Sequence, residues 1–380
     1  MLESLYIYGM TMLIMVLLGL PYYNTYSLNK DSIVKVKRGH KLVTVILISL
    51  LFGTVFGLRW NVGTDYLAYL RIYIGNQTVI YSKEYLFKLL NDTLYNLNIH
   101  YSLYFGIFAF IQIFLLYFSL KKEAFLWIFI PLSLFGGLFF YDWMNGMRQE
   151  MASCIMLLGT NFIISKQPVK YFICLILAIG FHTSAILFIL IYPIMVKGKS
   201  LTPNWKVQEC MVASCAAVAV IVGDFFTKFL PILAVLQQME GDGGYTSIYN
   251  EGMLQKFSDI SNIGVMFYVF FFINILIIAY SNKIKSFFSG KKIRIYYNLY
   301  FWGMIFETLL SANMILIRPF RYFRIYKLIM IAYLLYYLYK NPSWKNSIIL
   351  GILMILLVGC VGLVCITHPY NFFFEIQEAP

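Results

Sequence analysis

The sequence predicts an all-α, polytopic integral membrane protein, and three observations lead to that prediction. Of its 380 residues, 61% are hydrophobic and only 12% are charged, whereas soluble domains contain about 45–50% apolar and about 25% charged residues. The mean hydropathy is +0.74. Apolar runs of nearly twenty residues, the length that crosses a bilayer as a helix, recur along the chain. Together these features exclude the soluble, fibrous and disordered classes.

Ten apolar runs are long enough to be full membrane spans. We expect them at about residues 4–23, 42–58, 101–120, 124–141, 149–165, 207–227, 262–281, 295–317, 325–340 and 347–366. The first run lacks the basic start and the small-residue cleavage site of a signal peptide, so we interpret it as a retained span. Since no soluble domain interrupts the series, residues 1–380 are expected to form a single membrane domain.

The connectors between these runs hold most of the Lys and Arg residues. The basic connectors are 30–41, 121–122, 166–170, 197–206, 283–294 and 340–345. The positive-inside rule predicts that all six are cytoplasmic, so the net charge of +13 reflects topology rather than nucleic-acid binding. On this topology 59–100 and 228–261 are periplasmic loops, and 367–380 is a periplasmic tail.

Residues 171–196 decide whether that topology is possible. A single crossing there would place the basic connectors 197–206 and 283–294 outside. We therefore expect a broken or re-entrant hairpin of two short helices that meet near Gly180–Ser184, with His182 at its tip. Such breaks are tolerated where they line a cavity or are buried in protein. One long tilted helix with a packed histidine is the alternative.

A smaller set of arginines falls on the outer side, against the positive-inside trend. Arg59 follows the second span, Arg148 opens the fifth, and Arg318, Arg321 and Arg324 recur at every third residue. The guanidinium fork suits phosphate, so several arginines around one pocket would form a pyrophosphate site. The alternative is that each one reaches lipid headgroups.

Two carboxylates are candidates for chemistry. Glu307 is expected near the middle of the ninth span, where an ionisable residue is a functional hypothesis by default, although it could pair with a neighbouring arginine. Asp65 follows the second span and could act as a general base, bind sugar hydroxyls, or be a plain loop residue. The six cysteines show no metal-ligand spacing, and no nucleotide-binding motif is present, so we expect neither a metal nor a cofactor.

Short motifs along the chain resemble the EpsG-like branch of the Wzy polysaccharide polymerases. The motifs are Arg59 with Val62-Gly63-Thr64-Asp65-Tyr66 and Tyr69; Glu84 followed by Leu89-Leu90-Asn91; Asn145-Gly146-Met147-Arg148-Gln149 with Ala152; Phe181-His182-Thr183-Ser184-Ala185; Tyr245; Arg321-Tyr322-Phe323; and Pro369-Tyr370. They cover most of the chain, and their order and placement are more specific than any one of them alone.

The resemblance implies a metal-independent glycosyltransferase with a GT-C-like fold in the bacterial inner membrane, with its active site facing the periplasm. Its donor and acceptor would be oligosaccharides on undecaprenyl diphosphate, which leaves when a repeat unit is transferred. Further partners would be membrane lipids and a chain-length regulator, with no nucleic acid.

On that reaction we assign roles to the candidate residues. Arg148 and Arg321 would stabilise the leaving diphosphate, supported by Arg59, Arg318 and Arg324. His182, and after it Asp65, would accept the proton of the acceptor hydroxyl, because an imidazole can accept a proton at neutral pH. The remaining predicted substrate-binding residues are Tyr66, Tyr69, Gln149, Tyr245, Glu307 and Tyr370.

Two other functions use similar chemistry. A flippase or exporter for lipid-linked oligosaccharides would also need cations around a cavity, but on both leaflets. An O-antigen ligase would use the same donor and leaving group. In the ligase family the key residues lie in one large outer loop, whereas here the candidates are scattered over several short segments.

Overall fold

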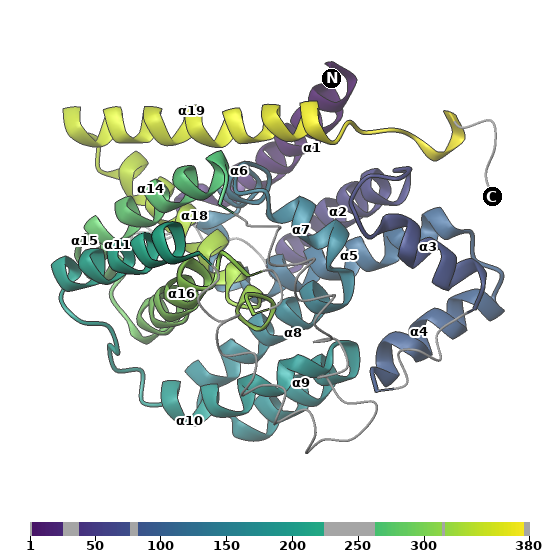
Figure 1. Ribbon diagram of the computed structural model, residues 1–380, viewed down its shortest axis with the longest axis horizontal. Helices are drawn as coiled ribbons and strands as arrows, with labels where there is room; N and C mark the ends of the chain where they lie inside the picture. Colours follow the sequence, from purple (N-terminus) through teal and green to yellow (C-terminus); the bar gives the residue numbers. More distant parts are fainter. Residues whose placement is uncertain (1, 26–37, 77–82, 224–262, 314–315, 376–380) are drawn as a thin grey trace.

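The computed structural model describes residues 2–25, 38–76, 83–223, 263–313 and 316–375, and these are overwhelmingly helical (Figure 1). The α-helices are α1 (Leu2–Gly19), α2 (Arg38–Gly57), α3 (Tyr66–Ile74), α4 (Tyr85–Asn96), α5 (Tyr101–Ser119), α6 (Ile130–Gly136), α7 (Phe139–Asn145), α8 (Met147–Ile164), α9 (Pro168–Phe181), α10 (Ile191–Met195), α11 (Trp205–Val222), α14 (Val265–Ala279), α15 (Ser281–Phe287), α16 (Lys291–Leu309), α17 (Arg318–Arg321), α18 (Arg324–Lys340) and α19 (Trp344–Thr367). The 3-10 helices are η1 (Leu20–Thr25), η4 (Lys121–Leu126), η5 (Thr183–Leu190) and η8 (Phe373–Glu375).

Several helices have the length and apolar composition of membrane spans. Within the described part of the chain, five do: Leu2–Thr25, Gly39–Gly57, Tyr101–Ser119, Trp205–Val222 and Trp344–Thr367. The pair α14 and α15 makes a sixth if its 53° bend lies within one span. These helices agree with a multi-pass membrane protein, while the number of ten spans stays a prediction.

Helices α2 and α5 pack closely because glycines line their contact. A Cβ atom on Gly57 would lie 2.6 Å from the carbonyl oxygen of Ser102, and one on Gly53 would lie 2.9 Å from that of Gly106. Small residues spaced four apart allow the backbones of membrane helices to approach in this way. The closely packed α2–α5 pair thus supports residues 58–65, which connect α2 to α3.

Replacing Gly57 with alanine is expected to destabilise the protein by about 1–3 kcal/mol, because the added methyl group overpacks the α2–α5 contact. The thermal midpoint of the detergent-solubilised protein measures this loss. Gly359→Ala on α19 is the matched control, since no atom lies within 4 Å of the position that its Cβ would occupy. Equal midpoints for the two variants would show that the contact tolerates a side chain.

The apolar run at 124–141, expected to be one span, is broken into η4, α6 and α7. Glu123 leaves helical geometry, with φ −105° and ψ 36°, and Leu138 adopts a left-handed conformation with φ 60°. Gly136 and Gly137 precede that turn, and Pro131 stands at the start of α6. The run is therefore not one continuous helix, because proline and glycine interrupt it, and its crossing of the membrane as a single span stays a prediction.

The segment 171–196 folds back on itself at His182. Helix α9 ends at Phe181, His182 is extended with φ −155° and ψ 117°, and η5 begins at Thr183. The Tyr171 hydroxyl donates to the Phe188 carbonyl oxygen at 2.5 Å, and the rings of Tyr171 and Tyr192 lie 5.2 Å apart. These contacts confirm the predicted hairpin of two short helices and exclude one continuous helix.

Basic connectors meet at one end of the bundle. Lys41 Nζ donates to the carbonyl oxygen of Lys121, and Lys292 pairs with Glu123. Arg294 Nε donates to the Gly198 carbonyl oxygen at 3.0 Å, which joins the connectors on either side of α11 and α14. The hairpin makes this possible, because it returns the chain to the end of the bundle from which α9 starts.

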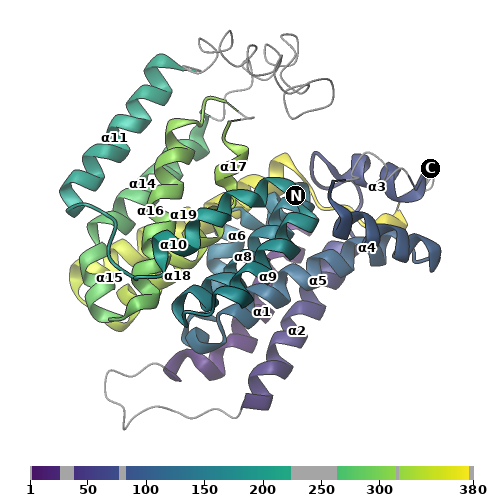
Figure 2. The ribbon, with the colours of Figure 1, turned by 90° about the horizontal axis from the view of Figure 1, so that it is seen from below.

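The opposite end carries α3, α4 and the segment after α19. Helix α4 lies between its N-cap Glu84 and its C-cap Leu97. Residues 371–373 pair with residues 58–60: Arg59 forms an isolated antiparallel bridge with Phe372, and Trp60 N donates to Asn371 O at 2.7 Å. The segment that follows α2 and the described tail therefore lie on the same side of the bundle (Figure 2).

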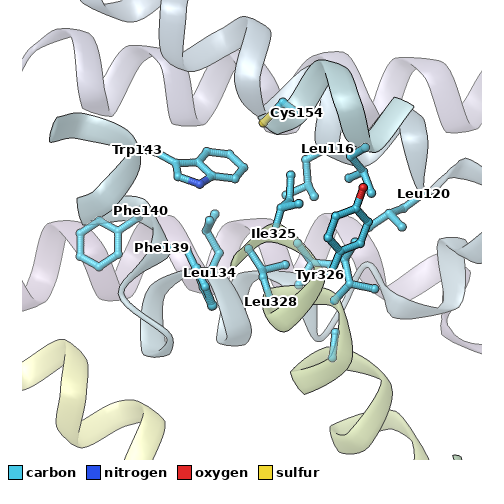
Figure 3. Close-up of a cluster of buried hydrophobic side chains, with 14 of the residues drawn as sticks. Leu116, Leu120, Leu134, Phe139, Phe140, Trp143, Cys154, Ile325, Tyr326 and Leu328 are labelled. Carbon is cyan, nitrogen blue, oxygen red and sulfur yellow. The ribbon is translucent and has the colours of Figure 1, made fainter. Parts of the chain in front are cut away.

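The core lies where α5, α6, α7, α8 and α18 meet (Figure 3). Helix α18 is the most enclosed element, with nearly every residue from Ile325 to Leu338 buried. The Tyr326 hydroxyl within it bonds the Thr160 hydroxyl of α8 at 2.6 Å. This rigid centre holds the start of α8 and the start of α18, where charged side chains concentrate.

Candidate active site

The carboxylate of Glu84 joins two of the predicted catalytic residues. Its Oε1 lies 2.5 Å from His182 Nδ1, and its Oε2 accepts a hydrogen bond from Arg148 Nη1. The Glu84 side chain is only 7% exposed, so this three-residue contact lies largely out of water. We call Glu84, Arg148 and His182 the Glu84 cluster.

Three separate backbone features bring these side chains together. Glu84 is the N-cap of α4, without using its side chain as the cap. Arg148 is the second residue of α8, after the turn at Gly146. His182 occupies the hairpin tip, where the chain is extended. The cluster therefore ties the first outer segment, α8 and the hairpin to one another.

Glu84 fixes the tautomer of the His182 imidazole. An ionised carboxylate only accepts hydrogen bonds, so Nδ1 of neutral His182 must carry the proton, which leaves Nε2 as the basic nitrogen. No described residue hydrogen-bonds to Nε2. This nitrogen is consequently available to take a proton from a bound hydroxyl.

Tyr69 completes one side of the cluster. The ring is buried on α3, and Arg148 Nε donates to its hydroxyl at 3.4 Å. The Arg148 guanidinium also lies 5.5 Å from the centre of the Phe87 ring. Burial raises the pKa of Tyr69, so its hydroxyl stays protonated and can donate a hydrogen bond in turn.

A second group of ions surrounds Arg324. Its Nη1 lies 2.6 Å from Asp142 Oδ2, and its Nε lies 2.7 Å from Glu307 Oε1. Glu307 stands two residues before the end of α16, not in the middle of a span, because that helix ends at Leu309. The expectation of a mid-span carboxylate was wrong in position, while the alternative of pairing with arginine is confirmed. We call Asp142, Glu307 and Arg324 the Arg324 cluster.

The two clusters adjoin each other through the segment from α17 to the start of α18. Gln149 Nε2 donates to the Arg318 carbonyl oxygen at 2.5 Å, so Gln149 holds the backbone of α17. The Tyr322 hydroxyl bonds Ser184 of the hairpin at 3.0 Å, and its ring lies 6.2 Å from that of His182. The arginine run and the hairpin tip therefore form one continuous region.

Arg318 and Arg321 differ in their surroundings. Arg318 is exposed on α17, whereas Arg321 is partly buried and lies within electrostatic range of Asp142 and Glu150. Glu150 is buried on α8, two residues after Arg148. Arginines and carboxylates are mixed throughout this region. An incoming anion would therefore have to replace a carboxylate as the partner of an arginine.

Three predicted binding residues lie elsewhere. Arg59 is 2% exposed and donates to the carbonyl oxygens of Phe56 and Met144, at 2.7 and 3.4 Å. Tyr66 is buried beside it, and the Tyr370 hydroxyl donates to the Val55 carbonyl oxygen. Arg59 thus ties α2 to α7 and Tyr370 ties α2 to the tail, and the binding of substrate by these three residues stays a prediction.

The two remaining predicted residues are Asp65 and Tyr245. Asp65 is exposed at the N-cap of α3, where its backbone N–H donates to Asn145 Oδ1 at 3.5 Å. Tyr245 lies outside the described residues. His182 is thus the predicted base that the structure places beside arginine.

Most of the chain matches the model of one protein family. The EpsG family model matches residues 42–376. The chain belongs to the EpsG family. No curated protein and no solved structure matches it.

Both clusters of this EpsG-family protein lie inside the matched range. The family consists of glycosyltransferase-like polysaccharide polymerases, so lipid-linked saccharides are the class of substrate to consider. In the described part of the chain, no group of three or more His, Cys, Asp or Glu side chains is placed to hold a metal ion.

The structure of the EpsG-family protein also adds residues that sequence reasoning did not assign. Glu84 was noted only as part of a motif, although an acidic residue directly ahead of an amphipathic helix is a signal that could have marked it. Asp142 ends a broken apolar segment three residues before Asn145. Lys327 continues the three-residue spacing of the arginine run, which places it on the same face of α18 as Arg324.

The Glu84 cluster predicts a pH dependence for the stability of this EpsG-family protein. Burial alone would raise the pKa of Glu84, but hydrogen bonds and charge from His182 and Arg148 outweigh it and hold this pKa below 4.5. A carboxyl whose pKa falls on folding adds stability above its unfolded pKa and loses it as the pH drops through the folded value.

At neutral pH we expect Glu84→Gln to cost about 3 kcal/mol, because it leaves Arg148 without its carboxylate. The difference in thermal midpoint between wild type and variant should shrink as the pH falls below 4.5. Thermal unfolding in detergent across that pH range measures it. A difference that stays constant down to low pH would show that the ionised Glu84 does not stabilise the fold.

Proposed function

We propose that this protein joins oligosaccharide repeat units that are linked to undecaprenyl diphosphate, at the outer leaflet of the bacterial inner membrane. The observation that carries the proposal is the Glu84 cluster, in which one buried carboxylate holds both an imidazole and a guanidinium. Membership in the EpsG family supports the reaction class.

In the proposed step, the acceptor hydroxyl oxygen attacks the anomeric carbon of the donor chain. The bond between that carbon and the diphosphate oxygen breaks, and its electron pair leaves with undecaprenyl diphosphate. His182 Nε2 takes the proton of the acceptor hydroxyl. Glu84 holds the imidazole through Nδ1 and stabilises the imidazolium that forms, as a carboxylate does for histidine in other transferases and hydrolases.

Arginines would stabilise the charge that develops on the leaving diphosphate. Arg148 stands beside the proposed base, and Arg321 and Arg324 follow in the adjoining region. Donors that are already oriented in a site poor in water stabilise such charge more strongly than water does. We propose that the reaction needs no metal, and that the fold is of the GT-C type with its site facing the periplasm.

Reconstitution tests this function. The purified protein in vesicles receives undecaprenyl-diphosphate-linked repeat units without nucleotide or added metal, and the products are separated on a gel. A ladder of multiples with release of undecaprenyl diphosphate is the expected result. Movement of the lipid-linked unit between leaflets without a ladder would instead indicate a flippase, and transfer only to a lipid A core would indicate a ligase.

A further inference from the structure

A cavity of about 180 Å³ lies beside the Arg324 cluster, between α14, the end of α16 and the start of α18. One wall is apolar and comes from α14, and the other carries charged and polar groups. The apolar residues are Met266, Phe267, Phe270 and Phe271; the polar ones are Asn274, Glu307, Thr308, Ser311, Arg324 and Lys327. The cavity therefore combines an aromatic surface with two cations, Arg324 and Lys327, and one carboxylate, that of Glu307.

Lys327 differs from its neighbour Arg324. The Arg324 guanidinium is held by Asp142 and Glu307, at 2.6 and 2.7 Å. Lys327 is 7% exposed, and its Nζ lies 4.8 Å from the centre of the Phe270 ring. Within the described ranges no oxygen accepts a hydrogen bond from this ammonium and no carboxylate forms an ion pair with it.

The charges of Glu307 and Asp142 act on this ammonium, but neither carboxylate hydrogen-bonds to it, so on burial it exchanges strong hydration for a weaker interaction. The cation–π contact with Phe270 returns only part of that cost. An anionic group in the cavity would supply the missing partner, and the phenylalanines of α14 would contact an apolar chain attached to it.

The opposite face of α14 points out of the bundle. Val265, Tyr268 and Phe272 are 71%, 54% and 42% exposed, and their spacing places them on one side of the helix. The cavity is thus one helix away from the apolar surface of the molecule. At its other end, Arg324 connects it to Asp142 and so to the segment that leads into α8.

We propose that this cavity binds the phosphate group of a polyprenyl carrier, with Lys327 Nζ as its ligand and the α14 phenylalanines against the first isoprene units. The proposal rests on the function proposed above and places the lipid-side phosphate of the donor against Lys327, next to Arg324, which lines the same cavity. The volume suits a head group and not a whole polyprenyl chain.

Binding of radiolabelled undecaprenyl diphosphate to the full-length protein in phosphatidylcholine nanodiscs tests the site. Lys327→Met, which removes the ammonium and keeps most of the length of the side chain, should weaken binding about tenfold or more, the loss expected for one charge-assisted hydrogen bond. Lys327→Arg keeps the charge and should bind within a fewfold of wild type. Lys285→Met is the matched control, because Lys285 also lies over an aromatic ring, 4.3 Å from that of Tyr297, at the connector end.

Equal binding by Lys327→Met and wild type would overturn the proposal, as would an equal loss in Lys285→Met. Competition by inorganic diphosphate would support a head-group site, whereas equally strong competition by phosphatidylglycerol would overturn it in favour of a general anionic-lipid site. Since binding is measured without the polymerisation reaction, failure here leaves the proposed function standing. Failure to form a ladder, in turn, leaves this binding result unchanged.

Discussion

Arg148→Ala is expected to abolish polymer while the protein still inserts and accumulates in membranes. Arg148 reaches both the Glu84 carboxylate and the Tyr69 hydroxyl, so its guanidinium is already oriented beside the proposed base. Removing one oriented donor from a site that stabilises developing charge typically costs about 10²–10³ in rate. The measurement is the reconstituted ladder, normalised to the amount of folded protein.

Two further variants make this result specific. Arg148→Lys keeps the charge but loses the fork that can hold a carboxylate and a phosphate together, so we expect most of the activity to be lost. Arg71→Ala removes an exposed arginine from α3, in the same outer segment, and should leave the ladder unchanged. Normal chain length in Arg148→Ala would rule out its role at the diphosphate.

His182→Ala should reduce the rate about 10²–10⁴-fold, the usual contribution of a positioned general base. The imidazole at the hairpin tip is held by Glu84 and leaves Nε2 available, which is the geometry that proton transfer needs. Added imidazole should restore part of the activity of the alanine variant, because the small base can enter the space left by the side chain. A residue with a purely structural role would show no such rescue.

The accessibility of the hairpin tip provides an independent check. A cysteine at position 182 should react with a polar thiol reagent added from outside, since the native side chain is 18% exposed. His368→Ala, at the end of α19, is the matched histidine control and should retain activity. Full activity of His182→Ala would transfer the role of base to Asp65, and persistent protection of the cysteine would favour a packed histidine.

The hairpin could be predicted because charge and helix geometry constrain it together. Only a chain that reverses near residue 182 keeps the connectors 197–206 and 283–294 on the side of the other basic loops, and the ion pair of Lys292 with Glu123, next to the connector 121–122, is the expected result. The arginines expected on the outer side could be singled out for the same reason, because they depart from the positive-inside rule. Both inferences compare the positions of charged residues with that rule, and a sequence shows those positions directly.

The partners of those arginines could not be predicted. Glu84 is 64 residues from Arg148 and 98 from His182 along the chain, so only tertiary packing reveals their contact. Asp142 is 182 residues from Arg324. The break at Leu138 escaped prediction as well, because hydropathy does not register a single left-handed residue inside an apolar run.

The pairing of residues 371–373 with 58–60 has a consequence for assembly. The Tyr370 hydroxyl and the Val55 carbonyl oxygen that it contacts are separated by 315 residues, so the contact closes a loop that includes nearly all of the helices. Contacts between such distant residues form late, after the segments between them have been inserted and packed. During synthesis, residues 58–60 would lack their pairing partner until α19 has been inserted. The segment that carries Glu84 would therefore reach its final position in one last step. The protein would become active at that step rather than gradually as its helices enter the membrane.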